Sequence, residues 1–191
     1  MNFVTFLEGL ALSLSILAAA SIVYYTLRYG ISPMPSSRAV RQEIMEILPV
    51  LDSGEVFELG SGFGTLAIPL ARHYPNLQIT GFEISPLPCW IARLRARLLG
   101  LHNVHFIRRD FLSEDLSRPQ LLVSYLYPGG MKKIAETLQS RAAAPQYFLS
   151  HTFALPGHEP TEKRVATDIY RSPIYLYKLG THPKRQSSGE A

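Results

Sequence analysis

Short apolar runs alternate along the chain with amphipathic stretches, and this alternation predicts strands separated by helices. Runs rich in β-branched and aromatic residues predict strands at 55–59, 77–83, 104–108, 121–127 and 146–151. Apolar positions three or four residues apart predict helices near 65–73, 86–99 and 130–141. Strands and helices in this order form an α/β fold, a doubly wound parallel sheet covered on both faces.

The N-terminal pattern differs because it is continuously apolar. Gly9 to Leu27 contains nineteen uncharged residues. At about 1.5 Å per residue, a helix of this length nearly matches the hydrocarbon core of a bilayer. Tyr24 and Tyr25 fall where an interfacial aromatic belt belongs. We therefore expect residues 1–30 to form one transmembrane anchor.

Charges on the two sides of this segment predict its orientation. Glu8 is the only charged side chain before it, whereas Arg28, Arg38 and Arg41 follow. The positive-inside rule then places the rest of the chain in the cytoplasm, or in the matrix if the membrane is mitochondrial. The competing interpretations are a buried core helix and a cleaved signal peptide with Ala18 to Ala20 as the processing site, although the basic N-terminal region of such a peptide is missing.

After this segment, the composition indicates one globular domain. The chain has 191 residues, of which 47% are hydrophobic, enough for one sizeable core and too few for two. A Pro/Ser linker at 31–35 breaks the first helix, and Ser36 or Ser37 can cap a second helix that runs to about Leu48. We assign residues 31–180 to the domain, and expect the polar tail at 181–191 to be disordered.

The strongest chemical signal lies where the first strand meets the next helix. Glu58 is followed by three glycines at alternate positions, Gly60, Gly62 and Gly64. Glycine is needed where φ is positive or where a ligand lies directly on the backbone, and the N–H groups of the following helix face that ligand. The dinucleotide fingerprint GxGxxG would require glycine at Thr65, so NAD is disfavoured.

Two further acids follow the next two predicted strands. Glu83 ends the second strand, nineteen residues after Gly64, and Asp110 follows the third. Because neighbouring parallel strands end at the same edge of a sheet, we expect both carboxylates to lie near the glycine turn. A carboxylate at the tip of the second strand is the residue type that binds ribose hydroxyls.

This pattern resembles class I S-adenosylmethionine-dependent methyltransferases. Glu58 and the GxGxG glycines correspond to motif I of that class, and Glu83 corresponds to the acidic residue that follows the next strand. The resemblance implies S-adenosyl-L-methionine as cofactor, in a Rossmann-like fold whose last strand is antiparallel. The runs near 163–169 and 173–179 would be the sixth and seventh strands.

The same resemblance assigns roles to individual residues. Glu58 would interact with the amino group of the cofactor, Glu83 with both ribose hydroxyls, and Asp110 with the adenine amine. The residues expected to complete the cofactor site are Gly60, Ser61, Gly62, Gly64, Ile84 and Phe111.

A narrower resemblance concerns the acceptor. The segment GFEISPLPCWIARLRARLLG at 81–100 resembles GYELNPWLVWYSRYRA of the mitochondrial ATP synthase c-subunit lysine methyltransferase family and its prokaryotic relatives. This resemblance implies that the methyl acceptor is a lysine side chain of a protein substrate. Because the enzyme is expected to be anchored, the substrate protein can itself be membrane-embedded. Two positions depart from the family, because Phe63 replaces an Asp and Glu58 replaces a residue that is often Asp.

The turn after the fourth predicted strand bears on the acceptor as well. YLYPGG at 125–130 stands where enzymes that methylate adenine or glutamine nitrogens have Asn/Asp-Pro-Pro-Tyr, so such targets are disfavoured. A lysine must react as the neutral amine, which burial with an aromatic or carbonyl lining favours by lowering the pKa of the amine. Cation–π attraction would orient the ammonium before deprotonation. Tyr127 is our candidate catalytic residue, as a liner of the acceptor site, with Tyr125 next.

Charge and cysteine content leave two alternatives and exclude others. With 19 basic and 15 acidic residues the net charge is +4, which admits an RNA methyltransferase, although we consider nucleic acid an unlikely partner. A cofactor-binding scaffold without turnover is the second alternative, motivated by Phe63. One cysteine excludes internal disulfides, and we assign no metal because His102 and His105 lack a third ligand.

The predicted helix at 86–99 has two distinct faces. Arg93 and Arg97 share one face, while Ile91, Leu94, Leu98 and Leu101 share another. The simplest interpretation is that the arginines form a solvated face, and contact with anionic lipid is the alternative that the anchor would allow.

Overall fold

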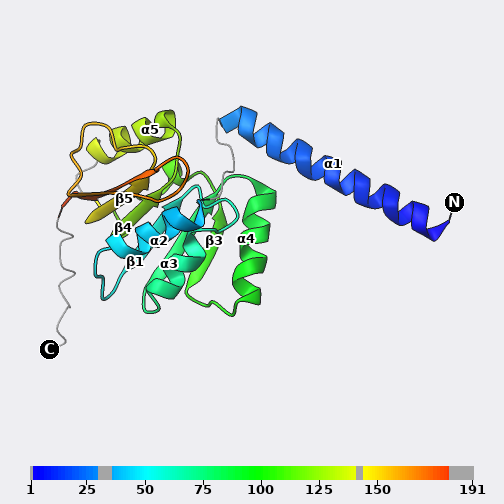
Figure 1. The fold of residues 1–191 in the computed structure, drawn as a ribbon, viewed down its shortest axis with the longest axis horizontal. Helices are drawn as coiled ribbons and strands as arrows, with labels where there is room; N and C mark the ends of the chain where they lie inside the picture. Colours follow the sequence, from blue (N-terminus) through cyan, green and yellow to red (C-terminus); the bar gives the residue numbers. More distant parts are fainter. Residues whose placement is uncertain (1, 30–35, 141–143, 181–191) are drawn as a thin grey trace.

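A seven-stranded sheet forms the centre of the computed structural model, which describes residues 2–29, 36–140 and 144–180 (Figure 1). The expected linker at 31–35 and the expected tail at 181–191 lie outside the described residues. The strand order is β3-β2-β1-β4-β5-β7-β6. The strands are β1 (Glu55–Leu59), β2 (Gln78–Glu83), β3 (Val104–Arg108), β4 (Leu121–Ser124), β5 (Tyr147–His151), β6 (Glu162–Val165) and β7 (Pro173–Lys178).

Strand directions follow the expected pattern of a mostly parallel sheet with an antiparallel last strand. Strands β1 to β5 pair in parallel, and β7 runs antiparallel to both β5 and β6. The carboxyl ends of β1, β2 and β3 therefore lie side by side at one edge of the sheet. The antiparallel β7 places its first residues beside the carboxyl end of β5, where Ile174 pairs with His151.

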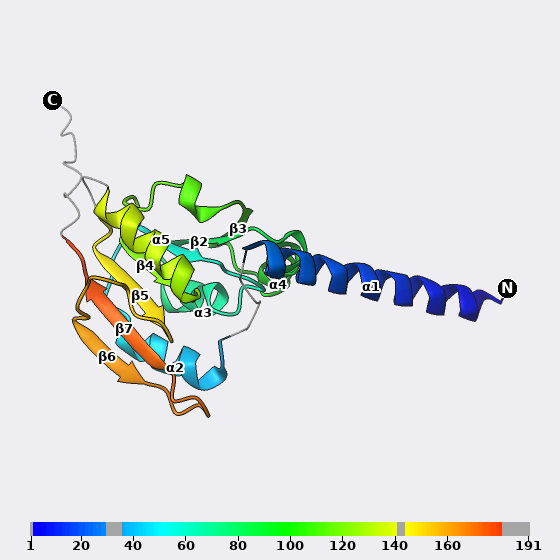
Figure 2. The same ribbon diagram turned by 90° about the horizontal axis from the view of Figure 1, so that it is seen from above.

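Helices cover both faces of this sheet (Figures 1 and 2). The helices are α1 (Phe3–Tyr29), α2 (Arg38–Ile47), α3 (Ala67–His73), α4 (Pro86–Leu98) and α5 (Pro128–Gln139), with a short 3₁₀ turn η1 at Phe111–Ser113. One hydrophobic cluster joins α2, α3 and α4 to one face, and a second joins α5 to the other. Strand β4 is buried on both faces and is almost continuously apolar, whereas β1 is nearly as buried but carries two acids, Glu55 and Glu58.

Several predicted boundaries are wrong. Strand β6 ends at Val165 instead of residue 169, and helix α5 begins at Pro128 instead of residue 130. Strand β4 ends at Ser124 instead of residue 127, because Pro128 occupies the first turn of α5, where its missing N–H costs nothing. Tyr127 is thus the N-cap residue of α5 and not part of a strand. Helix α3 begins at Ala67 instead of residue 65, because the glycine turn continues through Leu66.

Helix α1 projects away from the domain (Figures 1 and 2). Its segment Phe3–Tyr25 has a mean hydropathy of 2.0 and is long and apolar enough to cross a membrane, a test that signal sequences near an N-terminus also pass. Neither hydrophobic cluster of the domain contains a residue of α1. Its link to the domain includes a hydrogen bond from Arg108 Nη2 to Tyr25 Oη, 3.1 Å long.

Candidate functional site

The glycine turn after β1 has the backbone that its sequence predicts. Gly60, Gly62 and Gly64 have φ values of +79°, +52° and +71°, which residues with a Cβ rarely adopt. The N–H groups of Gly60 and Ser61 both donate to the carbonyl of Phe82, at 3.0 and 2.8 Å. These bonds hold the turn against the end of β2.

The surroundings of Gly62 and Gly64 differ. A Cβ added to Gly64 would lie 2.7 Å from the ring of Phe106, so this glycine allows the turn to pack on the core. A Cβ added to Gly62 would meet nothing within 4 Å, so this glycine faces open space. Between them, the carbonyl of Phe63 accepts a hydrogen bond from Arg95 Nη1, which fixes the backbone where the sequence departs from the family.

Glu83 ties this turn to the start of α4. Its Oε2 accepts from the N–H of Gly62 at 2.8 Å, and its Oε1 accepts from the N–H of Ser85 at 2.7 Å. A carboxylate has about four acceptor positions, so two remain for hydroxyl groups of a ligand. The side chain is only 9% exposed and is therefore held in one orientation.

Glu58 is a buried acid next to this turn. Its Oε2 and the Oγ of Ser61 are buried atoms without a hydrogen-bond partner among the described residues. Burial raises the pKa of Glu58 well above its usual value; a hydrogen bond from the Ala67 backbone lowers it, and the charge of Glu83 raises it further. Unpaired buried polar atoms are costly, so this pair is suited to a polar ligand group.

Asp110 follows β3 at the same edge of the sheet. It is exposed and caps η1, with Oδ1 accepting from the N–H of Leu112 at 3.0 Å. Its other carboxylate oxygen accepts no hydrogen bond within the described part of the chain, so it can accept one from a ligand amine. Phe111, the next residue, is half-buried.

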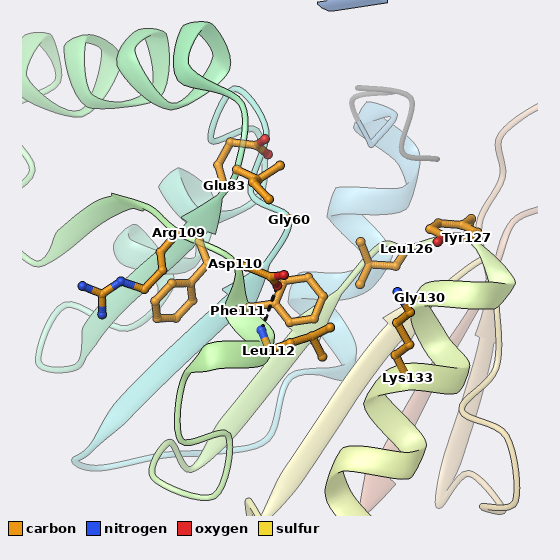
Figure 3. A pocket seen from close by; sticks show the side chains of 12 residues that line it. Gly60, Glu83, Arg109, Asp110, Phe111, Leu112, Leu126, Tyr127, Gly130 and Lys133 are labelled. Carbon is orange, nitrogen blue, oxygen red and sulfur yellow. Dashed lines mark hydrogen bonds between the residues drawn. The ribbon is translucent and has the colours of Figure 1, made fainter. Parts of the chain in front are cut away.

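These residues surround a pocket that is open to solvent, and the empty space between its walls, open solvent included, is about 560 Å³ (Figure 3). Its lining consists of Gly60, Phe82, Glu83, Ile84, Arg109, Asp110, Phe111, Leu112, Leu126, Tyr127, Gly130 and Lys133. Six of the ten predicted site residues are in this lining. Of the other four, Glu58, Ser61 and Gly64 are buried, and Gly62 is joined to the pocket through Glu83.

Sequence reasoning missed half of the lining. Arg109 and Leu112 are adjacent in the chain to Asp110 and Phe111, which were predicted. Adjacency to these two residues was the signal that could have identified them. Leu126, Gly130 and Lys133 gave no comparable signal, because their placement depends on α5 beginning at Pro128.

Tyr127 lies at the rim of this pocket, across from Asp110 and Glu83 (Figure 3). It is 37% exposed, and its ring packs over Gly129, where an added Cβ would lie 2.5 Å from the ring. A glycine at position 129 thus allows the ring to adopt this position.

A second polar cluster lies at the carboxyl end of β5. The ring of His151 stacks on Tyr125 with centroids 3.9 Å apart, and its Nε2 is hydrogen-bonded to Ser36 Oγ at 2.9 Å. Burial lowers the pKa of His151 to about 4, and the charge of Asp168 opposes this shift. His151 is therefore neutral at physiological pH and joins β5, the turn after β4 and the start of α2.

Comparison with known proteins adds a family match. The family model of the ANTKMT methyltransferase domain matches residues 58–162, more than half of the chain. The matched region begins at Glu58 and includes Glu83, Asp110 and Tyr127.

Three curated relatives are methyltransferases with different acceptors. A release factor glutamine methyltransferase of Vibrio cholerae is 31% identical over 48% of this chain and 32% of its own length. A protein-lysine N-methyltransferase of Saccharolobus islandicus is 22% identical over 78% and 94%, respectively. An ATP synthase c-subunit lysine N-methyltransferase of Xenopus laevis is 27% identical over 66% and 57%. The chain thus spans less than two thirds of two of these relatives.

A solved structure shows the same fold. An RNA methyltransferase from Salinibacter ruber, in complex with S-adenosyl-L-homocysteine, aligns with a TM-score of 0.68 at 24% identity. The alignment covers 79% of this chain and 97% of that one. The mixed sheet and its helices are thus a Rossmann-like methyltransferase fold.

Proposed function

The chain belongs to the ANTKMT methyltransferase domain family of class I S-adenosylmethionine-dependent methyltransferases, and on this premise we propose that it methylates a lysine side chain of a membrane protein. The cofactor is S-adenosylmethionine, which supplies an electrophilic methyl group on a sulfonium. The acceptor and the membrane are the two parts of the proposal that go beyond the family.

The pocket has the polar groups that this cofactor needs. The two remaining acceptor positions of Glu83 bind the ribose hydroxyls, and the outer oxygen of Asp110 accepts from the adenine amine. The unpartnered Oε2 of Glu58 binds the ammonium group, directly or through a water molecule. Gly62 leaves open space beside these acids. Gly60, Ser61 and Gly64 shape the turn, and Ile84 and Phe111 add apolar walls.

The observation that supports a lysine acceptor is the Tyr127 ring at the rim of the same pocket. A primary amine attacks only when neutral, and a weakly polar aromatic lining favours the neutral form over the solvated ammonium. Tyr127, Leu126 and Gly130 supply such a lining, with no acid among them. The match to lysine methyltransferases of an archaeon and a frog supports the same acceptor class.

The membrane part of the proposal depends on α1. Its apolar side chains are exposed in the described structure and pack into no core cluster of the domain. An enzyme and a substrate held in one bilayer meet at a high effective concentration. These features support the proposal of a single-pass membrane protein with the domain in the cytoplasm or matrix.

An RNA methyltransferase is the second candidate, favoured by the net charge of +4. It differs from the main proposal in its salt dependence, because contacts to many phosphates weaken steeply as salt rises. A scaffold that binds the cofactor without turnover is the third candidate, and Phe63 remains the feature that motivates it.

The deciding experiment supplies the full chain with radiolabelled S-adenosylmethionine and membranes from cells that lack the gene. We expect label in membrane protein and methyl-lysine in its hydrolysate. The Glu83→Gln variant is the negative control, since it loses ribose binding. Label in nucleic acid would support the RNA alternative, and donor binding without any labelled product would support the scaffold.

A further inference from the structure

Helix α4 exposes a stripe of large apolar side chains. Trp90, Leu94 and Leu98 are 60%, 40% and 77% exposed, and Leu99 after the helix is 44% exposed. Positions four residues apart lie above one another on a helix surface, so the first three form one stripe. We name Trp90, Leu94 and Leu98 the α4 stripe. The apolar pattern of this helix therefore does not serve the core alone.

The chain around this stripe is strongly basic. Residues 84–109 contain five arginines and no aspartate or glutamate, a charge of +5, whereas the whole chain carries 19 − 15 = +4. The rest of the molecule is thus slightly acidic, and the excess positive charge is concentrated here. The exposed side chain of Arg97, which borders the stripe, makes no hydrogen bond or ion pair among the described residues, although its backbone carbonyl accepts from Gly100 N–H.

The stripe lies at the end of the domain from which α1 projects. Helix α4 and the edge strand β3 form this end, and α4 lies crosswise to α1 (Figures 1 and 2). Helices α1 and α4 are in contact, and Arg108 of β3 donates to Tyr25 of α1. A plane perpendicular to α1 at this end would therefore run along α4.

From this placement we infer that α4 is a second membrane-contacting element, whose apolar stripe enters the headgroup region of an anionic phospholipid bilayer while its arginines contact the phosphates. The inference depends on the proposed insertion of α1. Tryptophan and leucine on one helix face with arginine beside them are the residue types of helices that lie in the interface. Two contacts, α1 and α4, would fix the orientation of the domain on the membrane.

Nucleic acid fits the same charge less well. Phosphate contacts to RNA use the arginines but leave Leu94 and Leu98 in water, with no gain from their apolar surface. A bilayer interface engages the arginines and the apolar stripe together.

Trp90 is the only tryptophan in the chain, so its fluorescence reports on α4 without labelling. The full chain is reconstituted into vesicles of phosphatidylcholine, with or without phosphatidylglycerol, and its flotation is measured first. We then expect the Trp90 emission to shift to shorter wavelength and acrylamide quenching to fall in the anionic vesicles, with a smaller change in phosphatidylcholine alone. Brominated lipids should quench the same emission.

Matched variants distinguish a contact made by the α4 stripe and its arginines from the effect of removing any surface charge or any exposed apolar side chain. Arg97→Gln should lower the ratio of docked to undocked α4 about fivefold, since one arginine at an anionic surface contributes that factor. Arg72→Gln, a charge removed from the exposed end of α3, is the control and should change nothing. Leu98→Gln should also reduce docking, whereas Ile169→Gln should not, although Ile169 in the loop before β7 is 96% exposed.

Each outcome separates the two ideas. Flotation with a Trp90 emission that stays water-exposed in anionic vesicles would overturn the α4 contact and leave the anchor standing. Absence of flotation would overturn both, yet methyl-lysine in labelled membrane protein would still support the enzymatic part. A Trp90 shift caused by RNA in detergent, without lipid, would assign the surface to nucleic acid.

Discussion

Gly62 and Gly64 have similar left-handed backbones but different surroundings, and they allow binding to be separated from folding. For Gly62→Ala we expect a loss of about 1 kcal/mol in stability, the cost of a left-handed alanine, because no atom lies within 4 Å of the new Cβ. Cofactor binding should fall much further, since the methyl group enters the open space of the site. Urea unfolding and calorimetric titration measure the two effects.

Gly64→Ala is the matched comparison. Its Cβ would lie 2.7 Å from Phe106, so overpacking adds to backbone strain and the loss of stability should be ~3 kcal/mol. Equal unfolding free energies for the two variants would show that the turn is not packed as described.

Glu58 makes cofactor binding depend on pH. Burial raises the pKa of Glu58 well above its usual value, so the protonated form persists to higher pH than for an exposed glutamate, and a bound ammonium would favour the carboxylate. Binding should then release a fraction of a proton, and affinity should rise as pH rises through the raised pKa. Calorimetry in buffers of different ionisation enthalpy counts the released protons.

The control for this pH dependence lies on the same strand. Glu58→Gln should bind the cofactor more weakly and without proton release, whereas Glu55→Gln, outside the pocket, should behave like the wild type. Proton release that persists in Glu58→Gln would assign the titration to another group.

At the residue scale the sequence located acids and glycines well, because both are required by local geometry. Glu83 and Asp110 share the predicted pocket, and the three glycines have the predicted positive φ. What no sequence pattern indicated is that Glu83 is already bonded to Gly62 and Ser85, since these contacts depend on how two loops meet.

At the scale of elements, the junction of β4 and α5 positions Tyr127. Gly129→Ala would bring a Cβ to 2.5 Å from the Tyr127 ring and should rotate that ring out of its position. We expect acceptor kcat/KM to fall about tenfold, a change of about 1.4 kcal/mol in transition-state binding, with cofactor affinity unchanged. Tyr127→Phe should retain most activity if the ring acts as a lining, whereas Tyr127→Ala should not.

Helix α2 depends on His151 through the bond to Ser36. Because burial lowers the pKa of His151 from about 6.5 to about 4, unfolding takes up a proton below pH 6.5. Stability is thus complete above that pH and falls as pH drops towards 4, by up to ~3 kcal/mol. Asp168 is the charged group facing the ring and limits this effect.

Denaturant unfolding at a series of pH values tests this linkage. His151→Gln should be less stable at neutral pH but should lose less stability on acidification than the wild type. His158→Gln, on the loop after β5, should keep the wild-type slope. An unchanged slope in His151→Gln would assign the acid sensitivity to carboxylates.

The sequence predicted which segments are helices and which are strands. It did not predict some of their boundaries or the exposed apolar surface of α4. All seven strands exist near the predicted ranges, because the hydrophobic pattern and the β-propensity of the residues agree there. The end of β4 was missed because aromatic residues favour a strand while Pro128 begins a helix. The exposure of Leu94 and Leu98 could not be read from periodicity, which shows that residues share a face but not what covers it.

At the scale of the whole molecule, the core of the domain is independent of α1. Every residue of the two hydrophobic clusters lies between Val40 and Leu179. The domain of residues 32–191 should therefore fold and bind the cofactor alone, with an affinity within about twofold of the full chain. Calorimetric titration of both proteins checks this expectation.

Removing α1 should instead change the reaction with a membrane acceptor. Two proteins confined to one bilayer react at a raised effective concentration, so the 32–191 fragment should methylate a membrane-embedded acceptor ~100-fold more slowly at equal low concentration. In detergent the acceptor and the enzyme are no longer confined together, and the two rates should converge. Equal rates on intact membranes would show that α1 does not bring the enzyme to its substrate, and the acceptor would then have to be sought among soluble molecules.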